Sequence, residues 1–235
     1  MKKAWKWIVP VIILAFLTGG FLVYSGIYYR ADATALAALE SDDAVSVTPA
    51  SYGWFFDGPS AENALVFYPG AKVEETAYAP LLHKLAQEGM DVCLVKMPLR
   101  FAFFGADKAD AVIKAFEYEH WYIGGHSLGG AMAAQYAAGH SDQLTGLILF
   151  AAYPTKKLDD SLLEISIYGS EDRVLNMEKV EAGKAFAPAN YFEYRIEGGN
   201  HAQFGNYGVQ KGDGAAKITG PEQQQAAVGF IIQHS

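Results

Sequence analysis

The sequence WYIGGHSLGG at residues 121–130 is the most informative segment of this chain of 235 residues. Its first three residues are aromatic or β-branched, as residues of a buried strand usually are. The alanine-rich residues 131–138 that follow have high helix propensity. Between strand and helix lies Gly125-His126-Ser127-Leu128-Gly129, a G-x-S-x-G pattern. At a turn from strand to helix, this pattern holds its serine in a strained conformation above the sheet edge, with glycines where larger side chains would collide.

A serine in this position points to nucleophilic catalysis. The start of the following helix would aim free N–H groups at an oxyanion formed when Ser127 attacks a carbonyl. The pattern by itself is weakly specific, because a chain with this much glycine contains one by chance about one time in ten. The alternative is a glycine-rich turn with an inert serine. The flanking strand and helix favour the catalytic interpretation.

The N-terminus carries a long apolar segment. Residues 8–29 are uncharged and follow three lysines, and about 22 residues at about 1.5 Å each span the hydrocarbon core of a bilayer. Trp and Tyr residues at its two ends are typical of membrane interfaces. We expect residues 1–30 to form an uncleaved, single-pass cell-membrane anchor with the rest of the chain extracytoplasmic. The alternative is a signal peptide of a secreted protein, but the small-x-small site at residues 31–33 lies beyond the whole apolar run.

The rest of the chain is acidic. Only four of the 18 Lys and Arg residues, and none of the 26 Asp and Glu residues, precede Ala31, so the remainder has a net charge near −12. This charge argues against nucleic-acid binding and against adhesion to anionic lipid beyond the anchor. The lone cysteine, Cys93, lies in an apolar run and is expected to be buried. No Cys/His cluster has metal-ligand spacing, and we expect no metal and no cofactor.

Apolar strands alternate with helices along the chain. Residues 31–63 are expected to form a short helix at 31–41 and an edge strand or hairpin at 45–56, and residues 64–235 the catalytic domain. Strands are predicted at 64–68, 92–97, 121–123, 147–152, 165–168 and 191–196, and helices at 78–87, 107–118, 131–138, 177–186 and 221–233. This order predicts an α/β fold with a mostly parallel, doubly wound sheet and helices on both faces. The ten residues 155–164 leave no room for a large lid domain, so we expect an open site for compact acyl groups, unless the bilayer presents a lipid directly.

Polar residues follow three of these strands. Ser127 follows the first, Gly169-Ser170-Glu171-Asp172 follows the strand at 165–168, and Gly198-Gly199-Asn200-His201 follows the last. The carboxyl ends of parallel strands share one edge of a sheet. Serine, acid and histidine therefore appear in the order of a nucleophile-elbow hydrolase. The histidine would take the proton of the serine, and the carboxylate would hold the histidine in the correct tautomer.

Other residues compete for the base and the acid. His126 adjoins the serine, but the alternation of side chains along the strand directs it away, which leaves His201 as the base. The remaining histidines are expected to be solvated or capping: His83, His120, His140 and His234. For the acid, Glu171 stays an alternative to Asp172. The less favoured carboxylates are Asp159, Asp160 and Asp213.

The oxyanion hole needs two N–H donors. One is expected from Leu128, directly after the serine, and the other from the loop at residues 69–72. In that loop Gly70 lets the backbone approach the substrate, and Ala71 is the expected donor. Lys72 is a candidate for substrate binding at the mouth of the site or is simply solvated. The glycine-rich residues 205–214 order the histidine loop, form one wall of the site or are a flexible surface loop.

These motifs resemble those of the α/β-hydrolase superfamily. The resemblance rests on FYPGAKVE at residues 67–74, GHSLGG at 125–130, YGSED at 168–172 and GGNHAQFG at 198–205. It runs from about residue 64 to the end of the chain and is greatest for small membrane-anchored bacterial proteins related to dienelactone hydrolase. It implies an α/β-hydrolase fold with the triad Ser127, Asp172 and His201. The chain lacks the HGG loop of lipases and has serine where dienelactone hydrolases have cysteine, so the resemblance implies no substrate.

The sequence thus predicts a serine hydrolase that cleaves an ester or related acyl bond of a small molecule through an acyl-enzyme on Ser127. An acyltransferase using the same acyl-enzyme is one alternative. A catalytically silent envelope binding protein on the same fold is another, because a fold alone does not imply a function.

Overall fold

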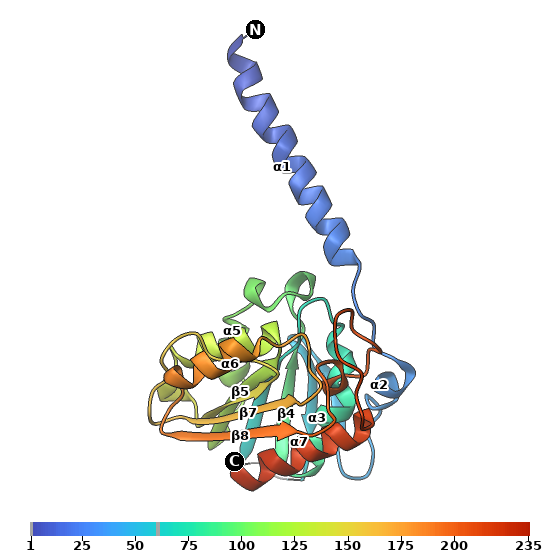
Figure 1. Cartoon of the computed structure of the whole chain (residues 1–235), viewed down its shortest axis with the longest axis vertical. Helices are drawn as coiled ribbons and strands as arrows, with labels where there is room; N and C mark the ends of the chain where they lie inside the picture. Colours follow the sequence, from blue (N-terminus) through green and yellow to red (C-terminus); the bar gives the residue numbers. More distant parts are fainter. Residues whose placement is uncertain (1, 60–61) are drawn as a thin grey trace.

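An eight-stranded sheet runs through the body of the protein in the computed structural model, which describes residues 2–59 and 62–235 (Figure 1). The strand order is β1-β2-β4-β3-β5-β6-β7-β8. The pairs β1–β2 and β2–β4 are antiparallel, and all other pairs are parallel. The strands are β1 (Ser46–Ala50), β2 (Gly53–Asp57), β3 (Asn63–Tyr68), β4 (Met90–Val95), β5 (His120–His126), β6 (Gly146–Phe150), β7 (Leu163–Gly169) and β8 (Asn190–Ile196).

The helices α3, α4, α5 and α6 each connect two consecutive strands of the parallel part of the sheet, and α1 projects from the body (Figure 1). The helices are α1 (Lys2–Gly26), α2 (Ala33–Ala37), α3 (Ala79–Gln87), α4 (Lys108–Ile113), α5 (Leu128–Ala137), α6 (Met177–Gly183) and α7 (Gly220–His234). Within α1, the window Val9–Gly26 has a mean hydropathy of 1.9. By its length and composition, this helix could cross a membrane.

Each face of the sheet has its own core, because successive side chains of a strand point to opposite faces. On β3, Leu65 and Phe67 pack in one core together with residues of α3 and α7. Ala64 and Val66 pack in the other core together with residues of α4 and α5. The strands are therefore apolar throughout, as expected for a sheet that helices cover on both sides.

The fold class predicted from the sequence is confirmed. The body has the mostly parallel, doubly wound sheet of the α/β-hydrolase fold, and residues 46–57 form the antiparallel hairpin β1–β2 at one edge, where 45–56 was expected. No large lid interrupts the sheet, because β6 ends at Phe150 and β7 begins at Leu163 with no helix between them.

Three helices are shorter than predicted. The helix expected at 177–186 ends as α6 at Gly183, and residues 184–186 form a 3₁₀ helix. The helix expected at residues 31–41 is reduced to α2, which Asp32 caps by accepting a hydrogen bond from the Ala35 N–H. The helix expected at 107–118 ends at Ile113. The aromatic residues after it pack on neighbouring rings instead, with Phe116 against Phe55. Tertiary packing therefore overrides the helical pattern in this segment.

Candidate active site

Ser127 lies in the turn between β5 and α5, in a conformation that L-residues rarely adopt. Its φ is 53° and its ψ is −122°, and its N–H donates a 2.9 Å hydrogen bond to the carbonyl of Phe150. The glycines of the motif are required by close packing. A Cβ atom at Gly125 would lie 2.4 Å from the carbonyl oxygen of Tyr68, and one at Gly129 would lie 2.1 Å from the same atom.

His201 and Asp172 form a buried pair. The Nδ1 atom of His201 lies 2.7 Å from Oδ2 of Asp172, and the two side chains are 1% and 0% exposed. The other carboxylate oxygen of Asp172 accepts hydrogen bonds of 2.8 Å from the N–H groups of Val174 and Leu175. Because Nδ1 of His201 is engaged by the carboxylate, Nε2 is left for another partner. This Nε2 atom is buried and has no hydrogen-bond partner among residues 2–59 and 62–235.

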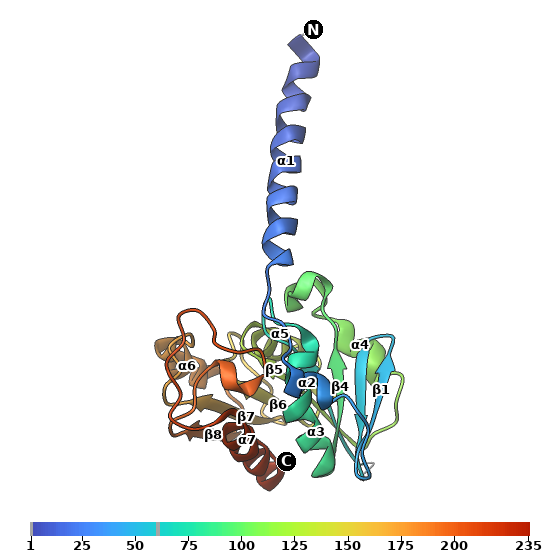
Figure 2. The ribbon, with the colours of Figure 1, turned by 90° about the vertical axis from the view of Figure 1, so that its right-hand side faces the viewer.

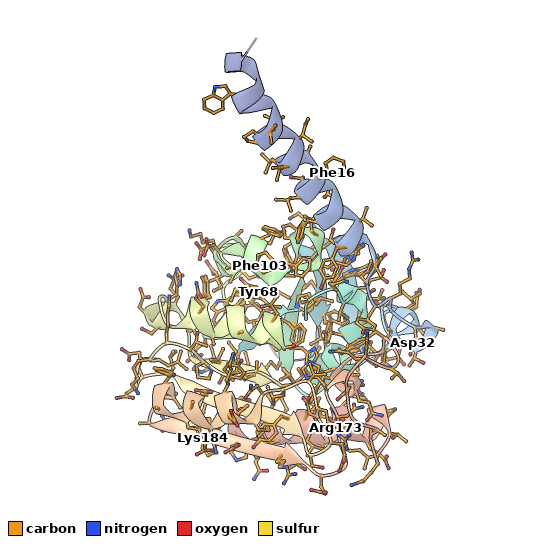
Figure 3. The ribbon with its side chains drawn as sticks, turned by 45° about the horizontal axis from the view of Figure 1, so that its top comes forward. Phe16, Asp32, Tyr68, Phe103, Arg173 and Lys184 are labelled. Carbon is orange, nitrogen blue, oxygen red and sulfur yellow. The ribbon has the colours of Figure 1, made fainter. Side chains whose placement is uncertain are left out.

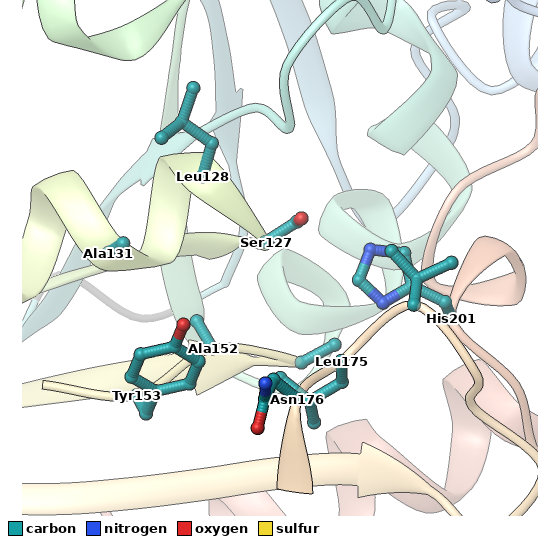
Figure 4. Close-up of a pocket in the computed structure, with 10 residues that line it drawn as sticks. Ser127, Leu128, Ala131, Ala152, Tyr153, Leu175, Asn176 and His201 are labelled. Atoms are coloured by element: carbon teal, nitrogen blue, oxygen red, sulfur yellow. The ribbon is translucent and has the colours of Figure 1, made fainter. Parts of the chain in front are cut away.

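His201 and Ser127 share one cavity. In Figure 4 the hydroxyl of Ser127 points toward the imidazole of His201. Both residues line a cavity of about 260 Å³ whose other walls are mostly apolar. The remaining lining residues are Leu128, Ala131, Ala151, Ala152, Tyr153, Val174, Leu175 and Asn176. The cavity therefore offers room for a compact apolar group beside the serine.

Glu171, the alternative acid, faces away from His201. Its carboxylate lies 2.6 Å from Nζ of Lys217, and this hydrogen bond holds the pKa of Glu171 below its ordinary value. The structure therefore brings Asp172, and not its neighbour, to the histidine. The described residues include no group of three or more His, Cys, Asp or Glu side chains that could hold a metal ion.

The other histidines lie outside this cavity. Three of them have backbone carbonyl partners: His83 with Ala38, His140 with Tyr136, and His234 with Phe230. His83 also lies 3.0 Å from Asp42, and His120 lies at the opposite, amino-terminal end of β5.

His126 directs its ring toward the space behind His201. The two rings are 4.4 Å apart between centroids, and Nδ1 of His126 lies 2.8 Å from the hydroxyl of Tyr78. Burial, followed by the proximity of His201, holds the pKa of His126 well below its ordinary value. His126 therefore stays neutral beside the pair of His201 and Asp172. Sequence reasoning did not identify Tyr78 as part of the site, because no local pattern distinguishes it from any other aromatic residue at a helix start.

The loop after β3 reaches the same place. A Cβ atom at Gly70 would lie 2.8 Å from the Tyr78 hydroxyl and 2.9 Å from Nδ1 of His126, so only glycine fits here. The N–H of Gly70 donates a 3.0 Å hydrogen bond to that hydroxyl and is therefore already engaged. The N–H of Ala71 has no acceptor among the described residues. Leu128 is the first residue of α5, so its N–H has no partner within the helix.

Lys72, the candidate for substrate binding, is not among the residues that line the cavity. Its ammonium lies 3.6 Å from the centroid of the Tyr24 ring on α1. Its backbone N–H donates to the carbonyl of Arg100 at 2.9 Å.

The glycine-rich residues 205–214 hold the histidine segment in place. The carboxylate of Asp213, one of the less favoured acids, accepts a 2.9 Å hydrogen bond from the N–H of Ala202. The amide of Asn200 donates to the carbonyl of Gly214 at 2.8 Å. The segment thus fixes the residues on both sides of His201.

Comparisons with known proteins identify the family of the chain. The model of the alpha/beta hydrolase family matches residues 64–225. The chain belongs to this family. No curated protein sequence shows significant similarity to it.

Solved structures of alpha/beta hydrolases share the fold at low sequence identity. A monoacylglycerol lipase from Paleococcus ferrophilus has a TM-score of 0.61 and 14% identity, covering 81% of this chain and 100% of the lipase. A putative dienelactone hydrolase from Klebsiella pneumoniae has a TM-score of 0.59 and 15% identity, covering 82% of this chain and 98% of the other. An esterase from Thermogutta terrifontis has a TM-score of 0.55 and 15% identity, covering 81% of this chain and 92% of the esterase.

Proposed function

We propose that this alpha/beta hydrolase is a serine hydrolase that cleaves an ester or related acyl bond through an acyl-enzyme on Ser127. One observation carries the proposal: Nδ1 of His201 is bound to Asp172 at 2.7 Å while its Nε2 has no partner in the described part of the chain, and His201 lines the same cavity as Ser127. A histidine held in this way has its basic nitrogen available for the hydroxyl of a serine.

The catalytic steps follow from this arrangement. Nε2 of His201 accepts the proton of Ser127 as Oγ attacks the carbonyl carbon of the substrate. Asp172 stabilises the imidazolium that forms and keeps its orientation. The imidazolium then gives its proton to the leaving alcohol, which departs as the carbonyl of the acyl-enzyme re-forms. In the second half, Nε2 of His201 takes a proton from water, and the oxygen of this water attacks the acyl carbon. The imidazolium then returns the proton to Oγ of Ser127 as the bond between Ser127 and the acyl group breaks and the acid is released.

The N–H groups of Leu128 and Ala71 form the oxyanion hole in this proposal. Both are without a backbone partner in the described structure, as a site for a developing negative charge requires. Gly70 contributes by its lack of a side chain and by its bond to Tyr78 rather than as a donor. The small cavity favours compact acyl groups, because about 260 Å³ holds only a short chain.

We also propose that α1 anchors the protein in the cell membrane as a single span, with the catalytic body on the extracytoplasmic side. The length and hydropathy of α1 support a span, and the lysines that precede its apolar window at Val9 support this orientation. Mass spectrometry of the purified membrane fraction checks it. An intact N-terminus is expected, whereas a soluble mature chain beginning near Asp32 would show a cleaved signal peptide.

Turnover of p-nitrophenyl acetate and butyrate tests the catalytic proposal. Ser127→Ala is expected to lower kcat by several orders of magnitude. Ser141→Ala, which changes a serine outside the cavity, is the matched control and should keep wild-type activity. Equal turnover by Ser127→Ala and the wild type would contradict the assignment of the nucleophile.

A further inference from the structure

An aromatic loop lies beside the end of α1. It consists of the 3₁₀ helices η2 (Pro98–Arg100) and η3 (Ala102–Phe104), and residues 98–104 are called the aromatic loop below. Leu99, Phe103 and Phe104 are 40%, 47% and 49% exposed, although they are large and apolar. Figures 1 and 2 both show this segment, in green, at the end of the body from which α1 rises. In Figure 3, Phe103 lies on that same side of the body.

The aromatic loop contacts α1 within its apolar window. The ring of Phe21 lies 5.7 Å from that of Phe101 and 5.9 Å from that of Phe104, measured between centroids. The ring of Tyr24 lies 6.4 Å from that of Phe101. Phe21 precedes the end of α1 at Gly26 by five residues, or about 7.5 Å along the helix axis. Rings in contact with Phe21 therefore lie at a depth that the apolar part of α1 occupies.

Two cationic side chains lie near this contact. The ammonium of Lys72 lies 3.6 Å from the centroid of the Tyr24 ring, and the guanidinium of Arg100 lies 3.4 Å from that of Tyr28. Aromatic rings paired with Lys and Arg are typical of the boundary between hydrocarbon and phosphate groups in a bilayer. The exposed apolar residues of the aromatic loop therefore lie close to two cations, Arg100 of the loop itself and Lys72 of the loop after β3.

The backbone of the aromatic loop is held in an unusual conformation. Leu99 and Arg100 have φ values of 51° and 61°, which L-residues rarely adopt. The carbonyl of Arg100 accepts the N–H of Lys72 at 2.9 Å, which fixes the loop to the residues after β3. Backbone strain of this kind usually persists where a segment has a function.

We propose that Leu99, Phe103 and Phe104 enter the bilayer that α1 spans and seat the catalytic body on the membrane surface. The inference rests on the anchor proposed above. The bilayer, rather than a second copy of the chain, is the occupant of this surface, because the contacts with Phe21 place the loop at the depth of the apolar window. The body is then held by two attachments, α1 and the aromatic loop. Because Lys72 is bonded to Arg100, the loop that carries Ala71 is fixed relative to the membrane surface.

Nitroxide accessibility in the full-length protein tests this seating. The variants Phe103→Cys and Phe104→Cys are spin-labelled and reconstituted in vesicles of phosphatidylethanolamine and phosphatidylglycerol. Cys93 is buried, so the label attaches to the introduced cysteine. Phe16→Cys, at a position 78% exposed on α1, is the lipid reference. Phe192→Cys, at a position 38% exposed on β8, is the matched control on the body.

Oxygen concentrates in lipid and a nickel chelate stays in water. We expect the spin labels at Phe103 and Phe104 to be more accessible to oxygen than to the chelate, like the label at Phe16. The label at Phe192 should be more accessible to the chelate than to oxygen. Chelate accessibility equal to that of the Phe192 label would overturn the proposal, because the loop would then stand in water. Protection from both reagents would also overturn it, since it indicates contact with another protein chain. A Phe16 label in water would remove the anchor and this inference together. Fluorophosphonate labelling of Ser127 in the same samples reports on the hydrolase proposal separately.

Discussion

Asp172 and Glu171 are adjacent in sequence but have different partners, which makes the assignment of the acid testable. Asp172→Asn is expected to leave folding nearly intact and to lower kcat by roughly 10⁴-fold, because an amide cannot hold His201 in the required tautomer. The carboxylate of Asp172 is 2.7 Å from Nδ1 of His201, so the effect should appear in kcat. Steady-state kinetics with p-nitrophenyl butyrate measure it.

Glu171→Gln is the matched control for this substitution. Glu171 is bound to Lys217 at the surface and not to His201, so its variant should turn over substrate at close to the wild-type rate. A large loss in Glu171→Gln with little loss in Asp172→Asn would reverse the assignment of the acid.

Tyr78 connects the loop after β3 with His126 through one hydroxyl. It accepts the N–H of Gly70 at 3.0 Å and lies 2.8 Å from Nδ1 of His126. Tyr78→Phe leaves that buried N–H without a partner, which costs about 1–3 kcal/mol of stability. It also releases the loop that carries Ala71, so kcat is expected to fall. Urea denaturation and kcat measure the two effects.

Tyr68→Phe is the control for Tyr78→Phe. Its hydroxyl is also buried and bonded to backbone, at Ala106 and Ala109. The variant should therefore lose stability while retaining kcat. Equal retention of kcat by Tyr78→Phe would mean that Tyr78 is only structural.

For single residues, the sequence predicted the positions that follow from the order of the strands. Ser127, Asp172 and His201 each follow a strand of the parallel sheet, and the strands bring them to one edge. It could not predict the partners that depend on side-chain direction. The ammonium of Lys72 lies over Tyr24, a residue of a distant segment, and no spacing in the sequence indicates that contact.

The segment that follows α1 pairs with the loop after β3. Tyr29 forms a parallel bridge with Val73, in which its N–H donates to the carbonyl of Lys72 at 2.8 Å. Tyr29→Pro removes this N–H. Because a small displacement in an active site lowers the rate strongly, kcat is expected to fall by roughly tenfold to a hundredfold.

Arg30→Pro is the matched control for this element, since the N–H of Arg30 has no acceptor among the described residues. The measurement is kcat of both variants, reconstituted in vesicles of phosphatidylethanolamine and phosphatidylglycerol. Equal rates for Tyr29→Pro and the wild type would show that the bridge does not position the site.

Among the elements, the apolar strands were predictable and the ends of helices were not. Continuous apolar runs such as β6 require burial on both faces, whatever surrounds them. The end of α4 at Ile113 depends on the packing of Phe116 against Phe55 of β2, a strand from another part of the chain. The parallel bridge of Tyr29 was likewise not predictable, because a single paired residue leaves no periodic pattern.

The stability of the whole body should depend on the ionisation of Glu164. This carboxyl lies near the amino end of β7, is 1% exposed, and has one oxygen without a partner among the described residues. Burial raises its pKa to about 8 from 4.5. The folded state therefore binds this proton more tightly than the unfolded chain does.

The free energy of unfolding is expected to fall as the pH rises, because the pKa of Glu164 is higher in the folded state than in the unfolded chain. The contribution to stability is fully present below about pH 4.5, falls as the pH rises, and levels off above about pH 8, for a total of a few kcal/mol. Glu164→Gln should remove this fall, as measured by urea midpoints over that range. An unchanged difference between the variant and the wild type at all pH values would show that Glu164 does not titrate in this way.

The whole protein can act as a serine hydrolase only if Ser127 is an activated nucleophile. A fluorophosphonate probe, followed by peptide mass spectrometry, measures this directly in the full-length protein. We expect one covalent adduct, on Ser127, formed far more slowly in His201→Ala because Nε2 then no longer removes the proton. An unlabelled wild-type protein, or an adduct that forms equally fast without His201, would contradict the assignment of Ser127 as a nucleophile activated by His201.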